Sequence, residues 1–101
     1  MFRRARFATV IDAQLDLFVR DHRDVIDEAN DRLDAYNRAG RDEAEELYGD
    51  YIDALETGTE ILADLRDHYA QTLDDADGYL IEFNRAVQKR LPAFALEIEN
   101  R

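Results

Sequence analysis

The feature that most constrains this chain is a repeat with alternating spacings of four and three residues over residues 44–76. Such spacing is typical of a helical seam, in which the a and d positions of each heptad face a neighbouring helix. Most members of the repeat are apolar, and it runs without a slip: Ala44, Tyr48, Tyr51, Leu55, Gly58, Leu62, Leu65, Tyr69, Thr72 and Ala76. Alternation with period two, which would indicate strands, is absent. The sequence therefore predicts an all-α fold.

A long helix is predicted before this seam, over residues 4–39. Its apolar positions fall on one face: Phe7, Ile11, Leu15, Phe18, Val25, Ala29, Leu33 and Tyr36. Gly40 follows as a natural C-terminal cap. Asp42 stands three residues before Glu45, which predicts a capping-box-like start for a second helix running to about Leu73. A short loop makes two helices antiparallel neighbours.

A third, shorter helix is predicted over residues 77–99, with a break at the segment TLDDADG, where Gly78 is the weakest helical position. The seam can also be continued through Tyr79 and Phe83, so one long helix is the alternative. Pro92 should kink the third helix or restart it. The predicted architecture is a single helical domain, residues 1–101: an antiparallel long helical hairpin plus a shorter third helix, or three-helix bundle.

The lengths of these helices predict self-association. The third helix is roughly 34 Å long and the first two are each roughly 50 Å, so the third covers only part of the hairpin. Apolar edge positions would then stay partly bare, and a two-fold homodimer is the commonest remedy. His22 lies on the apolar face without a metal ligand one turn away, which favours a structural or interface role. The predicted interface residues are Val10, Leu17, His22, Ile52 and Ile61.

Charge limits the partners. The chain has 24 Asp and Glu against 13 Lys and Arg, a net charge of −11, which is unfavourable for nucleic acid or an anionic membrane. One basic cluster, RRARF, is the exception, and Arg3, Arg4 and Arg6 are candidate contacts to an anionic partner. The absence of cysteine suits a cytoplasmic location, and no apolar run approaches the length of a membrane span. Arginine exceeds lysine and aspartate exceeds glutamate, which a GC-rich gene and a halophilic source both explain.

The acidic residues of the second helix are predicted to face water. Those at the f positions of the heptads are Glu46, Asp53, Glu60, Asp67 and Asp74. A catalytic metal site in a helical bundle requires carboxylates that project inward. Serine and cysteine, the ordinary nucleophiles, are absent from the chain. This pattern favours a non-enzymatic interaction or scaffold protein without a cofactor.

A resemblance supports one alternative function. The segment EELYGD, residues 45–50, resembles the EExGD-type segment of all-α nucleotide pyrophosphohydrolases, small helical oligomers that hold Mg²⁺ on clustered carboxylates. The likeness covers about six residues, and it departs from the pattern by one extra residue between Glu46 and Asp50. It implies a Mg²⁺-dependent hydrolase with Glu43, Glu46, Asp50 and Asp53 as metal ligands, and with Asp24, Asp27 and Glu28 as a partner cluster.

The acidic face generates a first prediction. Like charges at every seventh residue repel one another most strongly at low ionic strength. We expect the melting temperature to rise with added KCl, and to continue rising beyond ~0.2 M if the source is halophilic. Thermal melts across a KCl series measure this, and a melting temperature that stays flat between low and molar KCl would remove the halophile interpretation.

Overall fold

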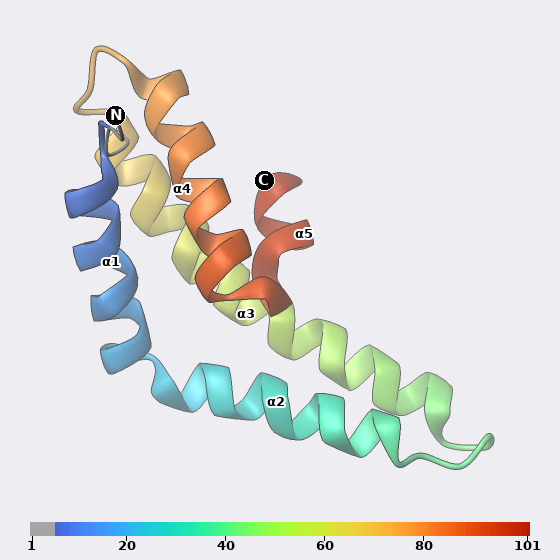
Figure 1. The fold of residues 1–101 in the computed structure, drawn as a ribbon. Helices are drawn as coiled ribbons and strands as arrows, with labels where there is room; N and C mark the ends of the chain where they lie inside the picture. Colours follow the sequence, from blue (N-terminus) through green and yellow to red (C-terminus); the bar gives the residue numbers. More distant parts are fainter. Residues whose placement is uncertain (1–5) are drawn as a thin grey trace, which may run out of the picture.

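The computed structural model describes residues 6–101, and all regular secondary structure in that range is helical, as predicted (Figure 1). The elements are α1 (Ala8–Asp21), α2 (Arg23–Asn37), α3 (Ala44–Ala70), α4 (Ala76–Arg90), the 3₁₀ turn η1 (Pro92–Phe94) and α5 (Ala95–Glu99). Within the described residues, no helix is both long enough and apolar enough to cross a membrane.

The single first helix predicted over residues 4–39 is wrong, because the chain bends at His22. This residue has φ −124° and ψ 34°, outside the helical region. Its N–H still donates to the carbonyl of Phe18, and its own carbonyl accepts from Val25 and Ile26, at 2.9, 3.1 and 3.2 Å. The bend therefore leaves these backbone groups hydrogen-bonded, and α1 and α2 meet at a wide angle (Figure 1).

The start of α3 also differs from the expected capping box. The helix begins at Ala44, and its N-cap residue, Glu43, makes no side-chain capping hydrogen bond. The carbonyl of Gly40 instead accepts from the N–H groups of Glu43 and Ala44, both at 3.1 Å. No glycine in the chain has a positive φ, so Gly40 is not a left-handed cap.

The break between the second and third helices is confirmed, and so is the effect of Pro92. The Oδ1 atom of Asp75 accepts a hydrogen bond from the N–H of Gly78 at 3.1 Å and caps α4. The helix ends at Arg90, and Pro92 begins η1, from which α5 turns back along α4 (Figure 1). The C-terminal segment is therefore a separate short layer.

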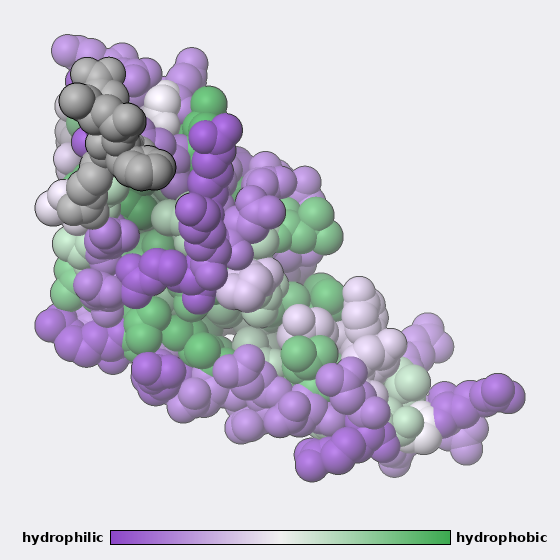
Figure 2. All heavy atoms as spheres, viewed as in Figure 1, coloured by the Kyte–Doolittle hydropathy of each residue, from purple (hydrophilic) through white to green (hydrophobic). Residues whose placement is uncertain are grey.

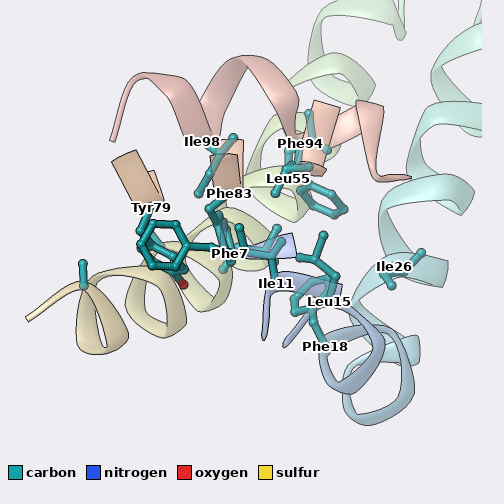
Figure 3. Packing of buried hydrophobic residues seen from close by; sticks show 14 of the residues in the cluster. Phe7, Ile11, Leu15, Phe18, Ile26, Leu55, Tyr79, Phe83, Phe94 and Ile98 are labelled. Carbon is teal, nitrogen blue, oxygen red and sulfur yellow. The ribbon is translucent and has the colours of Figure 1, made fainter. Parts of the chain in front are cut away.

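The side chain of Phe94 fills the space between α1 and α3. It is 2% exposed, and its ring packs edge-on against Phe18 with the ring centroids 6.2 Å apart (Figure 3). On the α3 side the ring lies directly on Gly58, where an added Cβ would come 2.8 Å from Phe94 Cζ. A close approach of this kind requires glycine.

The molecule consists of a body and an arm. The body contains α1, the C-terminal half of α3, α4, η1 and α5. The arm, residues 23–57, is formed by α2 and the N-terminal half of α3. Its buried apolar residues are Ile26, Ala29 and Leu55. The radius of gyration is 15.4 Å, whereas a compact chain of this length has about 13 Å, so the arm is not folded back onto the body.

The Phe94 contact generates a second prediction. Gly58→Ala should lower the free energy of unfolding by about 1–3 kcal/mol, because the new methyl group must displace a buried ring, and this outweighs the helix propensity gained. Gly49→Ala is the matched control in the same helix, since no atom lies within 4 Å of its added Cβ. The control should raise stability by up to about 1 kcal/mol. Urea denaturation measures both, and equal stabilisation by the two variants would contradict a tightly seated ring.

Candidate functional site

The five predicted interface residues do not form one surface. Leu17 is 45% exposed and the others are half-buried. Val10 and Leu17 are seven residues apart on α1, which places them on one face. Ile52 and Ile61 are nine residues apart on α3, a rotation of roughly 180°, so they lie on opposite sides of that helix. His22 lies at the bend. A single interface can therefore include only some of these residues.

His22 has a structural environment. Its ring packs against Phe18 with the centroids 5.5 Å apart and the planes tilted by 34°. Its backbone forms the junction between α1 and α2. These contacts fit the structural role predicted for it.

The basic N-terminal cluster is described only at Arg6, because Arg3 and Arg4 lie outside the described residues. Arg6 forms an ion pair with Asp75, with Nη1 and Oδ2 3.3 Å apart, and its guanidinium lies 5.0 Å from the Phe7 ring centroid. The N–H of Phe7 donates to Glu82 Oε1 at 3.0 Å, so α4 caps the start of α1. Arg6 thus connects the segment before α1 with Asp75, the N-cap residue of α4, through an exposed ion pair.

The carboxylates of the alternative metal site lie on the outside of the arm. Glu43, Glu46 and Asp53 are exposed, and Asp50 is half-buried. Arg32 pairs with Asp50 at 3.3 Å and donates to Glu28 at 2.7 Å. No group of three or more potential metal-ligating side chains occurs within residues 6–101. The guanidinium between the two carboxylates makes this region an ion-pair cluster, which fits Mg²⁺ poorly.

A cleft of about 670 Å³ lies between α1 and α4, which run parallel. Its lining consists of Ala8, Ile11, Asp12, Glu82, Arg85, Ala86, Gln88 and Lys89. The floor is apolar, since Ile11 is buried and both alanines are half-buried. The volume is within the usual range of ligand-binding clefts.

Two cations on the rim of this cleft are free. Arg85 and Lys89 are exposed and one helical turn apart, and neither forms an ion pair or hydrogen bond within the described part of the chain. The adjacent Arg90 is occupied, since it donates to Asp16 Oδ1 at 2.6 Å and to the carbonyl of Asp12 at 3.3 Å. The sequence signal for the pair was the only lysine of the chain, four residues after an arginine.

The arm carries a second, largely exposed feature, here called the arm stripe, in which only Ile52 is half-buried. It consists of Glu45, Tyr48, Ile52 and Glu56, spaced so that they follow one face of α3. Tyr48 was predicted to face a neighbouring helix in the seam, but 48% of it is exposed. Its ring lies 5.2 Å from that of Tyr36 and 6.4 Å from that of Tyr51, so the exposed aromatic group has packed support.

Two buried polar side chains were not found by sequence reasoning. Arg66 is 4% exposed and donates from Nη1 to Asn84 Oδ1 at 3.0 Å and to the carbonyl of Ile98 at 3.1 Å. It therefore ties α3 to α4 and α5. The hydroxyl of Thr59 is buried without a hydrogen-bond partner among the described residues. Both residues belong to the interior of the body.

No family model, curated protein or solved structure matches this chain. The surfaces that the described residues build are a cleft with an apolar floor and free cations, and a stripe with an aromatic centre and carboxylates. Both suit the binding of a complementary protein surface, because an apolar centre with a charged rim is the usual anatomy of an interface.

Tyr79 shows how strongly the interior controls ionisation. It is fully buried, its ring packs edge-on against Phe7 at 5.6 Å, and its hydroxyl donates to Gln14 Oε1 at 2.8 Å. Burial raises the pKa of Tyr79 to about 12. The phenolate cannot be solvated inside the body, so ionisation competes with folding.

A third prediction follows from this pKa. The contribution of Tyr79 to stability is complete below its unfolded pKa of about 10 and should be lost as the pH rises from there to about 12, a change of about 2–3 kcal/mol. Denaturation of the wild type and of Tyr79→Phe across this range measures it. The variant should be less stable at pH 7, since it loses the Gln14 hydrogen bond, and should show a shallower decline above pH 10. Parallel declines would contradict the assignment.

Proposed function

We propose that this chain is a non-enzymatic helical interaction protein that acts as a homodimer in the cytoplasm. The observation that supports this most directly is the arm, a pair of helices whose aromatic stripe is covered by no third helix within residues 6–101. Two-helix pairs bury little apolar surface alone, and they gain stability when a further layer packs against them. Figure 2 shows apolar surface inside the bend of the molecule, while the outer edge of the arm is hydrophilic.

The exposed area is consistent with a missing partner. The chain exposes 7036 Å². A folded monomer of this mass exposes about 5,900 Å², so the excess is roughly 1,100 Å². One subunit of a standard interface buries about 800 Å². A second copy could cover the excess with an interface of ordinary size.

The alternative is a Mg²⁺-dependent enzyme like the all-α nucleotide pyrophosphohydrolases. One observation favours it, namely that Glu28, Asp50 and Asp53 line the same small hollow on the arm. The ion pairs of Arg32 with two of these carboxylates oppose it. Hydrolysis of nucleoside triphosphates with Mg²⁺ that disappears in Glu46→Ala would replace the proposal with this alternative.

The fourth prediction concerns the mass in solution. Light scattering after size exclusion should give twice the monomer mass of 11.8 kDa, unchanged by Mg²⁺. The expected cause is apolar burial between subunits, which does not depend on a metal. A monomeric mass at both physiological and high salt would refute the homodimer. A dimer that forms only with Mg²⁺ would favour the alternative enzyme.

A further inference from the structure

The net negative charge is distributed unevenly. The arm contains twelve Asp and Glu and four Arg, and so carries −8 of the total charge of −11. The cleft lies in the body and carries Arg85 and Lys89 without ion partners among the described residues. The cleft lining also contains Asp12 and Glu82, but Glu82 accepts the N–H of Phe7 and Asp12 also has a partner. The two unpaired cations are therefore the charges in the cleft that the acidic arm would complement.

The arm stripe has the composition of an interface anchor. Its centre is Tyr48, an amphipathic aromatic residue of the type enriched among residues that dominate binding energy. Tyr36 and Tyr51 support its ring, so little conformational freedom is lost on docking. Glu45 and Glu56 flank it, and neither forms an ion pair within the described residues.

Glu45 is about one helical turn from Tyr48, and Arg85 and Lys89 are one turn apart on the rim of the cleft that Ile11 also lines. A tyrosine ring seated on the apolar floor would therefore bring the Glu45 side chain near the rim. The cleft volume of about 670 Å³ is ample for one aromatic side chain.

We propose that each subunit of the homodimer seats Tyr48 of its arm in the α1–α4 cleft of the other, with Glu45 facing Arg85 and Lys89. The inference rests on the proposed homodimer. The start of α3, which carries the stripe, and the α1–α4 pair, which lines the cleft, lie at opposite ends of the molecule (Figure 1). The occupant of the cleft would therefore come from a second copy. A two-fold axis makes the contact twice and closes the assembly, whereas a single head-to-tail contact would extend into a filament.

Two variants test this. The arm variant, Tyr48→Ser, removes the anchor, and the cleft variant, Arg85→Glu with Lys89→Glu, reverses the rim charge. Each changes exposed side chains only, and circular dichroism verifies the fold. A central contact of this type contributes about 30-fold in affinity. Each variant alone loses both contacts, so its dimer dissociation constant should rise about 1,000-fold and it should be monomeric by light scattering where the wild type is dimeric.

The decisive measurement is an equimolar mixture of the two variants. A chain with an intact cleft and a chain with an intact arm retain one of the two contacts, so dimer mass should return in the mixture at about 30-fold weaker affinity than in the wild type. Leu96→Ser and Arg101→Glu are controls for surface apolarity and charge elsewhere, because Leu96 is 70% exposed on α5 and Arg101 is exposed at the C-terminus. Both should remain dimeric.

The other outcomes separate this inference from the proposed function. If the wild type is dimeric and the arm and cleft variants are also dimeric, the interface is elsewhere and the inference fails, while the homodimer stands. Monomeric variants that do not form a dimer when mixed would also overturn arm-to-cleft docking. A monomeric wild type would overturn both proposals, and the cleft would then be open to a different acidic partner.

Discussion

The contact between Phe94 and Gly58 determines how the other elements are arranged. A ring from the C-terminal segment lies against the backbone of α3 and reaches Phe18 of α1 on its other side. This ring lies between α1 and α3, where the two helices would pack directly against each other in a straight hairpin. α1 packs beside α4 instead. The parallel α1–α4 pair, and with it the cleft, is a consequence of this insertion.

The bend at His22 follows from the packing of α1 on α4. Because α2 packs on α3 instead, the chain must change direction between α1 and α2. It does so at the backbone of His22, while the neighbouring residues keep their hydrogen bonds. The direction of α2 in turn fixes the arm. The packing of the body therefore determines which side of the arm no other helix covers among the described residues. Arg66 adds to this arrangement, since it holds α5 through the carbonyl of Ile98 and so helps to keep η1 in place.

Local sequence signals predicted the helical class and some of the boundaries. Periodicity indicated the all-α class and the range of α3, and Pro92 marked the restart of the third helix because a proline lacks the N–H that a continuous helix needs. The bend at His22 has no such signal, since no glycine or proline is near it and the packing that accompanies it involves Phe94, which is 72 residues away in the sequence. The candidate site could not be predicted for a similar reason. Periodicity assigned Tyr48 to a covered seam, but whether a third helix covers a pair of helices depends on tertiary packing, which local periodicity does not show. The cleft cations could not be assigned because they face a helix that is distant in sequence.

The acidic composition has two explanations, adaptation to high salt and recognition of a basic surface, and the distribution of charge bears on the choice between them. Adaptation to salt acts on hydration of the whole surface, and by itself it gives no reason to concentrate carboxylates in one region. Here residues 23–57 carry most of the net charge, while α4 exposes an arginine and the only lysine with no anionic neighbour at ion-pair distance among the described residues. An unpaired arginine and lysine beside an apolar cleft add little to the stability of the isolated chain. They favour the binding of an acidic surface, and complementary charge also accelerates such association and suppresses wrong pairings. This distribution supports the proposal that the acidic arm is part of a recognition surface as well as a hydrated one.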